Sequence, residues 1–388
     1  MKTKILTAAI ASVMASSVAM AEGHSNAVSS ALANGTVSGE VYGGYTNVGI
    51  DSNVTDLEAD TNISDFDLDI LRLGYNTNIS DSTELGIEVE WTLGDGPGQN
   101  SETRIRDLFV AKSINDNTTV TLGRFKQLAD RNEAVEESDA IFTGSVSGPS
   151  TLQSIENFDE TGEDLESDVA NLARRIDGIE VKHANASGLN GTVSIYKGGN
   201  DTSGGDSDRQ LSYAGSLGWQ GGSDDLSFGA TVALFKEDGG DTGQEADGYS
   251  LIVNGAMGPV VASLTYADRT QETNGAADVD YDSIGVAGAF NLGGASRSFD
   301  NYGVLQGPSV ASGDTAYEIG FNYNSASVEG STFALGSDYD ADAMGIVLNA
   351  YCGPNTKVYL SYTDEEWDFG AGTTAEFDQI ALGARLDF

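Results

Sequence analysis

Ile380-Ala381-Leu382-Gly383-Ala384-Arg385-Leu386-Asp387-Phe388 is the stretch that decides the fold, and it closes the sequence. Large or apolar residues recur at every second position from Ile380 onward, and the final residue is aromatic. Successive side chains of a β-strand point to opposite faces, so this pattern predicts a strand with one face in an apolar phase and the other in a wetter one. A soluble sandwich shows such alternation too, but seldom ends its last strand on a terminal Phe.

The ending resembles the closing strand of bacterial outer-membrane β-barrels, in which a terminal aromatic residue marks the chain for insertion. Such a protein needs an export signal, and the other end supplies one. Lys2 and Lys4 precede a short run rich in Ala and Ser, and Ala19-Met20-Ala21 has the small residues of a cleavage site. We expect residues 1–21 to be a cleaved signal peptide, which leaves residues 22–388 (388 − 21 = 367 residues) as one barrel domain.

Composition fits a large β protein with an unusual charge. Beyond the signal peptide no stretch approaches the ~20 apolar residues of a membrane helix, but a membrane strand needs only ~10. The chain has 49 Gly, 5 Pro, 15 Tyr and 14 Phe. Lys2 and Lys4 belong to the expected signal peptide, so 17 of the 19 basic residues remain after cleavage. With 60 acidic residues, the mature chain would have a net charge of −43. This charge excludes nucleic acid as a partner and concentrates cations.

The segment from Glu84 to Leu93 indicates which face is wet. One face has only apolar side chains, and Glu84, Glu88 and Glu90 share the other face with Gly86 and Thr92. Three glutamates could not be buried unpaired in a sandwich core. They could line a water-filled lumen while the apolar face meets lipid, so we expect them to point into the lumen.

Alternating segments recur through the whole chain and are joined by connections of two kinds. Short turns at 77–83, 114–117, 221–225, 258–259 and 352–356 alternate with long acidic loops at 50–65, 94–103, 198–208, 237–247, 268–280 and 363–376. This is the arrangement of transmembrane barrels, which have an even number of strands. We count sixteen or seventeen segments and predict an all-β antiparallel barrel of sixteen strands.

The longest interruption, residues 126–173, is the region expected to carry function, because long loops inside a compact domain are usually functional. It is strongly acidic, and after Lys126 at its start Arg131 is its only base among many carboxylates. Ten of the 17 bases of the mature chain lie between Arg72 and Lys182, on or beside the flanking strands. Opposed charges across a constriction are the simplest interpretation.

Several motifs, in order, resemble those of Gram-negative general diffusion porins. Arg72-Leu73-Gly74-Tyr75 and the Glu84 segment are similar to the second and third strands of that family. Val120-Thr121-Leu122-Gly123-Arg124, Arg174-Arg175-Ile176-Asp177-Gly178 and the final hairpin resemble later strands. The resemblance implies sixteen strands, a third loop (residues 126–173) folded into the lumen, and a homotrimer in outer-membrane lipid.

The family resemblance also implies which residues form the constriction. Its basic wall would be Arg72, Arg124, Arg174 and Arg175. The acids that face them would be those that follow the strand directly: Asp130, Glu133, Glu136, Glu137 and Asp139. By strand parity Arg72 points inward, whereas Arg124 shares parity with Leu122 and needs a bulge to turn inward. Alternatively, the arginines simply pair with lumen glutamates such as Glu88 and Glu90.

The resulting expectation is a porin for passive diffusion of ions and small polar solutes, with cation preference. A phosphate-selective porin is one alternative, since Leu122-Gly123-Arg124-Phe125-Lys126 is similar to a motif of that family, although bases are few here. A non-conducting structural or adhesin barrel is another. We expect no enzyme, because His24 and His183 are the only histidines. We expect no cofactor, except that Asp238, Asp241 and Asp247 lie in Gly-rich acidic sequence that could hold structural calcium.

Overall fold

The computed structural model describes residues 35–52, 61–92, 102–129, 141, 175–197, 211–223, 226–238, 244–273, 278–293, 296–330, 338–370 and 372–388. Only the backbone is described at 50, 52, 61–70, 92, 102, 175, 238, 244 and 273. The expected signal peptide therefore lies outside the described residues. The part of the chain that is described has no helix long and apolar enough to cross a membrane.

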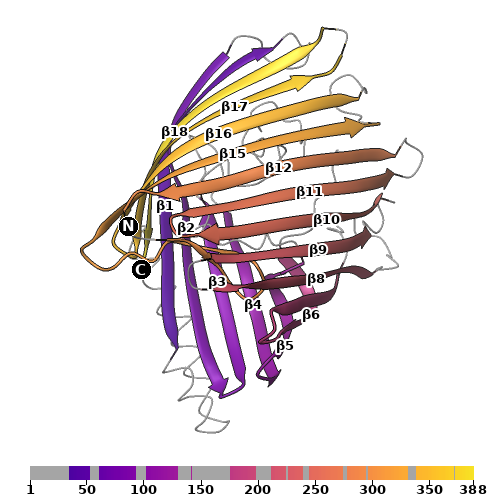
Figure 1. Cartoon of the computed structure of the whole chain (residues 1–388), viewed down its shortest axis with the longest axis vertical. Helices are drawn as coiled ribbons and strands as arrows, with labels where there is room; N and C mark the ends of the chain where they lie inside the picture. The colour runs from indigo at the N-terminus through magenta and orange to yellow at the C-terminus, as the bar shows by residue number, and fades with distance from the viewer. Residues whose placement is uncertain are drawn as a thin grey trace.

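Sixteen antiparallel strands form a closed barrel, which confirms the predicted fold class and strand number (Figure 1). Each strand pairs with its neighbours in sequence, and a small separate hairpin, β13 and β14, interrupts the numbering. The barrel strands are β1 (Thr36–Ser52), β2 (Thr61–Ser80), β3 (Thr83–Thr92), β4 (Glu102–Asn115), β5 (Thr118–Lys126), β6 (Arg175–Ala184), β7 (Leu189–Lys197), β8 (Leu211–Ser223), β9 (Leu226–Asp238), β10 (Gln244–Met257), β11 (Val260–Thr273), β12 (Val279–Asn291), β15 (Thr315–Glu329), β16 (Tyr339–Cys352), β17 (Thr356–Asp368) and β18 (Thr374–Asp387).

The last strand closes the barrel on the first. β18 pairs with β1 from Glu40 opposite Asp387 to Ser52 opposite Ala375. At the end of this seam the backbones of Gly39 and Phe388 exchange hydrogen bonds of 2.7 and 2.9 Å. The Phe388 ring covers Gly39 so closely that an added Cβ would lie 2.3 Å from the ring Cζ. A larger residue at position 39 would therefore displace the Phe388 ring from its place on the first strand.

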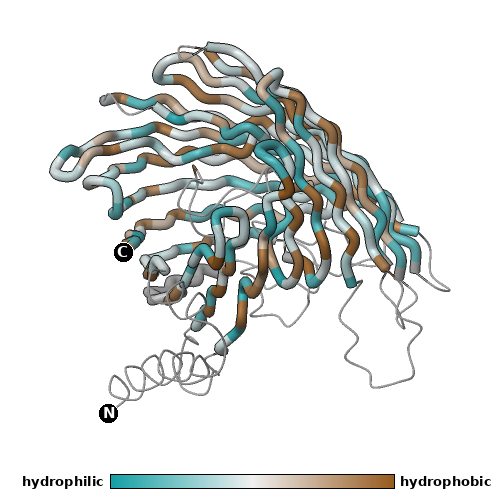
Figure 2. The backbone as a smooth tube through the Cα atoms, turned by 90° about the horizontal axis from the view of Figure 1, so that it is seen from below, coloured by the Kyte–Doolittle hydropathy of each residue, from teal (hydrophilic) through white to brown (hydrophobic). Residues whose placement is uncertain are grey.

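The two faces of the sheet differ as the alternation predicted. Ile380 is 48% exposed and Phe388 is 56% exposed, and large apolar side chains point outward in the same way on most other strands. Hydrophobic and hydrophilic residues alternate along the strands in Figure 2. The inward face instead has many buried polar residues, among them Thr192, Ser212 and Asn322. The outward row from Ile380 to Phe388 spans about 27 Å at about 3.4 Å per residue.

Most strands are longer than the ~10 residues expected, and the barrel strands range from 9 to 20 residues. The outward rows show why, since on β10, β11 and β17 the apolar row ends in a tyrosine and the strand continues into an aspartate, at Asp247, Asp268 and Asp364. The tyrosine hydroxyls donate to aspartates on the next strand in the pairs Tyr249–Asp268 (3.3 Å), Tyr266–Asp282 (2.8 Å), Tyr323–Asp342 (2.8 Å) and Tyr362–Asp378 (2.5 Å). The connections predicted at 237–247 and 268–280 shrink accordingly to 239–243 and 274–278.

Long and short connections lie at opposite ends of the barrel, with one exception. The connection between β5 and β6, residues 127–174, is the third at the long-loop end, after those that follow β1 and β3. The short-turn end has links of two to four residues, except between β12 and β15. That connection, residues 292–314, contains the hairpin of β13 (Ser298–Phe299) and β14 (Leu305–Gln306), which the sequence patterns did not indicate.

Candidate functional site

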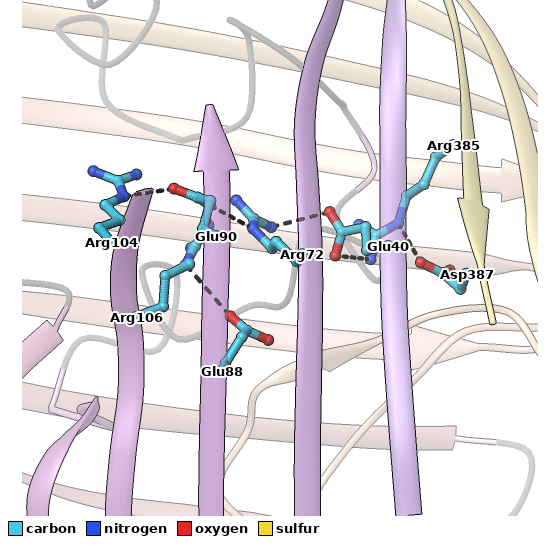
Figure 3. Close-up of polar contacts among 8 residues, drawn as sticks. All are labelled: Glu40, Arg72, Glu88, Glu90, Arg104, Arg106, Arg385 and Asp387. Carbon is cyan, nitrogen blue, oxygen red and sulfur yellow. Dashed lines mark hydrogen bonds and ion pairs between the residues drawn. The ribbon is translucent and has the colours of Figure 1, made fainter. Parts of the chain in front are cut away.

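Eight charged side chains form a network on the inward face of five adjacent strands (Figure 3). The charge alternates from strand to strand, with Arg385 and Asp387 on β18, Glu40 on β1, Arg72 on β2, Glu88 and Glu90 on β3, and Arg104 and Arg106 on β4. Four arginines thus match four carboxylates. We call this set the charge network.

Arg72 and Glu40 carry the network across the seam of the barrel. Arg72 Nη1 donates to Glu40 Oε1 at 3.0 Å, and Arg72 Nε donates to Glu90 Oε2 at 2.5 Å. On the other side of Glu40, Arg385 Nη2 donates to Oε2 at 2.8 Å, and Arg385 Nε donates to Asp387 at 2.9 Å. Glu40 and Arg385 are 345 positions apart in sequence, so only closure of the sheet brings them together.

Glu90 is the centre of the network and is fully buried. Arg104 Nε donates to its Oε1 at 2.5 Å, Arg106 Nη1 donates to its Oε2, and Arg72 occupies the third side. Arg106 also lies 3.5 Å from Glu88. A buried carboxylate is tolerated only when it is paired and hydrogen-bonded, so these contacts hold the side chains in fixed places on the wall.

The charge network runs obliquely along the barrel wall, from near the short-turn end to near the long-loop end. Glu40 lies four residues after the start of β1, at the short-turn end, whereas Glu90 lies two residues before the end of β3, at the long-loop end. Barrel strands tilt by about 35–45° from the barrel axis, so a row at right angles to them rises along that axis. Positive and negative groups are therefore presented at successive heights.

Several predicted site residues lie on this inward face. Arg72 is there with the parity expected of it, bound to Glu40 and Glu90 on the wall itself. Glu84, Glu88 and Glu90 share the inward face of β3, since Leu85, Ile87 and Val89 between them continue the outward row. The wall contacts of Arg72 correspond to the alternative interpretation, in which arginines pair with lumen glutamates.

Arg124 lies on the outward face, which corrects its assignment to the basic wall. Its register partners are Leu108 and Asp177, and Leu122 on the same strand is 57% exposed. Arg124 Nε lies 3.3 Å from Asp177 Oδ1, and both side chains are about half exposed. Gly123 does adopt a left-handed φ of +126°, yet the pairing of residues 118–126 with β6 continues unshifted through it. Parity therefore decides the direction of Arg124.

The other predicted constriction residues fall outside what the structure describes. These are Arg174 and the acids Asp130, Glu133, Glu136, Glu137 and Asp139, while Arg175 is described by its backbone alone. Of the observed connection 127–174, residues 127–129 and 141 are described, and they lie near inward side chains. Leu128 N donates to the buried carboxylate of Glu180 on β6 at 2.9 Å. Ala129 packs against Tyr196, Ala214 and other inward residues of β5–β10.

Ile141, further along the third loop, lies against a different part of the wall. Its carbonyl oxygen accepts hydrogen bonds from Asn349 Nδ2 on β16 at 2.8 Å and Lys357 Nζ on β17 at 3.2 Å. Its side chain packs among inward residues that include Val347 and Tyr359. The third loop is therefore fastened to β6–β10 at its start and to β16–β17 at Ile141.

Besides Arg104 and Arg106 of the charge network, four further described inward bases were not singled out from the sequence: Arg269, Arg297, Lys357 and Arg385. Arg269 lies between two aromatic rings, 5.9 Å from the centroid of Phe235 and 5.6 Å from that of Tyr281. Strand parity could have found Arg269 and Arg385, since each alternates with an outward apolar row. Arg297 could not be found in this way, because it precedes the hairpin rather than a barrel strand.

An aromatic cluster covers the inward face of β12 and β15–β18 near the long-loop end. Tyr339 stacks on Trp367 with a centroid distance of 5.3 Å and an interplanar angle of 5°, and Phe377 meets Trp367 edge-on at 5.8 Å. Trp367 is fully buried. The wall is therefore charged around the seam and aromatic beside it.

In the described part of the chain, no three His, Cys, Asp or Glu side chains lie close enough together to hold a metal ion such as the expected calcium. Asp247 points outward on β10 opposite Lys236, and Asp238 is described by its backbone alone. Asp241 lies outside the described residues.

Comparison with known proteins relates this chain to porin structures by fold alone. No family model matches the sequence, and no curated protein sequence matches it either. The anion-selective porin of Comamonas acidovorans superposes with a TM-score of 0.57 at 14% identity, over 92% of this chain and 100% of that one. The outer-membrane channel DcaP of Acinetobacter baumannii gives 0.57 at 13%, over 91% and 97%. The trimer form of OmpT, an outer-membrane protein of Vibrio cholerae, gives 0.51 at 15%, over 91% and 99%.

Proposed function

We propose that this protein is an outer-membrane porin, through which ions and small hydrophilic solutes diffuse passively. The observation that carries the proposal is the two-faced barrel, with an apolar outward band and an inward wall rich in polar and charged groups. An outward apolar face is stable in lipid, and an inward charge network needs a polar interior. The similar folds of a porin and an outer-membrane channel support this proposal.

The dimensions of the outward band support a membrane location. The row from Ile380 to Phe388 is about 27 Å long, and a strand tilt of about 40° reduces this to about 21 Å along the barrel axis. An outer-membrane barrel has an apolar band about 25 Å tall with aromatic girdles at its borders. The four outward Tyr–Asp pairs lie where one such border would be, since tyrosine sits at the interface and aspartate in water.

The third loop is proposed to cross the lumen and form the constriction. Ala129 is fastened near β6–β10 and Ile141 near β16–β17, and twelve residue steps separate them. An extended chain covers at most about 3.6 Å per residue, so about 43 Å is available for the crossing. The acids Asp130, Glu133, Glu136, Glu137 and Asp139 would then lie on the crossing segment, between the two walls.

The remaining features of the proposal rest on sequence and analogy. The charge of −43 on the mature chain favours cations at the mouths of the pore. A homotrimer is proposed by analogy with the trimer form of the Vibrio cholerae protein. Export through the cleaved signal 1–21 and the absence of enzymatic activity are parts of the same proposal.

A non-conducting barrel is the second candidate, and the aromatic cluster is the observation that favours it. Trp367, Val328 and Ala375 all point inward and are fully buried, so that part of the interior is filled. An interior that is filled throughout would pass no current.

Planar-bilayer recording with the purified protein tests both candidates. Stable conductance steps and a cation-selective reversal potential under a salt gradient are expected. Absence of conductance would refute the porin proposal and favour the structural barrel. Clear anion selectivity would refute the cation preference and favour the phosphate-selective alternative.

A further inference from the structure

The connection between β12 and β15 is unusual for the end of the barrel at which it lies. It has 23 residues (292–314), whereas the other connections at the short-turn end have two to four. In Figure 1 the arrow of β12 points to the end where the C-terminus of the chain lies. Backbone bonds tie the connection to that end, since Leu292 N donates to Tyr317 O and Gly353 N donates to Asp314 O.

The tip of the hairpin has a fixed shape. Asp300 N donates to Val304 O, and Gly303 N donates to Asp300 O, both at 3.0 Å. The Asp300 carboxylate accepts from the backbone N of Tyr302 at 2.8 Å and of Val304 at 2.9 Å. Gly303 has a left-handed φ of +82°, which glycine adopts without strain. Residues 300–304 therefore form a compact, internally bonded turn.

This tip lies inside the barrel against β8–β10. Asn254 Nδ2, on the inward face of β10, donates to Gly303 O at 3.0 Å. A Cβ placed on Gly303 would lie 3.2 Å from Gln220 Oε1 of β8 and 4.0 Å from Thr231 Oγ1 of β9. All three neighbours belong to the inward face. The tip therefore touches the wall from within.

The base of the hairpin is fastened to a different part of the wall. Arg297 donates to Glu318 on β15 through Nε at 2.6 Å and Nη2 at 3.0 Å, and Nη2 also lies 2.6 Å from the hydroxyl of Tyr351 on β16. The side chains of Arg297 and Glu318 are both fully buried. From this base to the tip, the hairpin cuts across the arc formed by β8–β12, β15 and β16 as a chord.

The same anchor also holds the third loop. Asn349 Nδ2 donates both to Glu318 Oε1 at 2.9 Å and to Ile141 O at 2.8 Å. Phe299 and Leu305 of the hairpin pack against the apolar cluster that contains Ile141, Ala256 and Val261. The hairpin and the third loop therefore meet inside the barrel, one from each end.

We propose that residues 296–306 form a second pore-narrowing insert, which limits solute size at the short-turn mouth and supports the third loop at Ile141. The proposal rests on the porin function proposed above. A pore with inserts from both ends has two narrow places in series, and pore diameter is a main determinant of what passes. Solutes that enter from the short-turn side would meet the hairpin before they reach the third loop.

The test shortens the hairpin and measures which polymers enter from each side. Replacing residues 299–305 by Gly-Gly suits the geometry, because Ser298 and Gln306 already face each other and two residues can join such a pair. Single-channel conductance is recorded with poly(ethylene glycol) of graded size on one side. Cys352, the one cysteine of the chain, lies exposed at the short-turn end, so a bulky maleimide reports the orientation of each inserted channel.

The shortened variant is expected to have a higher conductance than the wild type. It should admit larger polymers from the short-turn side, while the size limit from the long-loop side stays unchanged. Ser312→Ala, in the exposed part of the same connection, is the matched control and should change neither value. Equal conductance and equal short-side limits in the variant and the wild type would overturn the second narrowing.

A second variant and a comparison with the wild type distinguish failure of the hairpin proposal from failure to fold and from failure of the porin function. If the shortened variant does not fold, Phe299→Ala with Leu305→Ala trims the same insert and should shift the short-side limit in the same direction, and an unchanged limit overturns the proposal. If neither wild type nor variant conducts, the porin function itself fails. A silent wild type with a conducting variant would refute open diffusion but support the hairpin as the obstruction.

Discussion

Glu90→Gln is expected to destabilise the barrel by about 3 kcal/mol, because it removes the central charge of the charge network. Breaking a buried ion pair by removing one partner costs about 3–5 kcal/mol. The lower end applies here, since each arginine keeps another source of stabilisation. Arg72 retains Glu40, Arg106 retains Glu88, and the side chain of Arg104 is 62% exposed and can be hydrated. Glutamine keeps the shape of the side chain, so the loss reports charge rather than volume.

The assay is urea unfolding of protein folded into lipid vesicles, with the free energy of unfolding obtained by linear extrapolation. Glu376→Gln is the matched control, because Glu376 is an exposed outward residue of β18 and such changes stay within about 0.5 kcal/mol. Arg72→Met combined with Glu90→Gln should reveal a coupling energy of about 0.5–3 kcal/mol, as expected for residues in one network. If Glu90→Gln is as stable as Glu376→Gln, the account of Glu90 as a buried, paired carboxylate is wrong.

Three further predictions follow from the two faces of the wall. Arg124→Gln should lower the free energy of unfolding by less than about 1 kcal/mol, as for exposed ion pairs, and should leave the reversal potential unchanged. Arg72→Gln removes an inward positive charge and should increase the cation preference. Equal shifts in reversal potential for the two variants would contradict the outward placement of Arg124. In a Cys352→Ser background, a nitroxide attached at Leu217→Cys should show paramagnetic relaxation by lipid-soluble oxygen, and one attached at Ser216→Cys by a water-soluble reagent. The opposite pattern would contradict the assignment of the outward and inward faces. Cation preference should weaken with salt, because the Debye length falls from about 10 Å at 0.1 M to about 3 Å at 1 M, and reversal potentials at two mean salt concentrations measure this; no change would place the selective charges deep in the pore.

The fold was predictable because it depends on a local, repeated signal. Alternation between Ile380 and Phe388, and its recurrence in other segments, indicated both the closed barrel and the outward face. The strand ends were underestimated for a physical reason. Asp268 and Asp364 were assigned to loops, because aspartate is rare in strands, but β11 and β17 continue through them past the apolar band.

The site was less predictable, because its contacts join strands that are distant in sequence. The inward direction of Arg72 followed from parity, but its partner Glu40 becomes a neighbour only when β1 and β2 pair. Arg385 reaches Glu40 only through the closing seam. Arg124 shows the opposite error, since family position was given weight over a parity that already pointed outward. The hairpin of residues 298–306 left no periodic signal, because its strands have two residues each.

The acidity of the chain and the neutrality of the charge network together indicate where ion preference arises. On the wall around the seam, four carboxylates are matched by four arginines, so the network orients polar groups without selecting strongly by sign. The excess of 60 acids over 19 bases in the chain must therefore lie elsewhere. Among described residues, four aspartates place negative charge at the long-loop end of the outward rows: Asp268, Asp282, Asp342 and Asp378.

Charge at the mouth of a pore acts through water and is screened by salt. Charge on a narrow wall is screened less, because few mobile ions fit between the wall and the solute. Under the porin function proposed above, cation preference is thus expected to be a property of the pore entrance, and the two proposed inserts are expected to govern solute size.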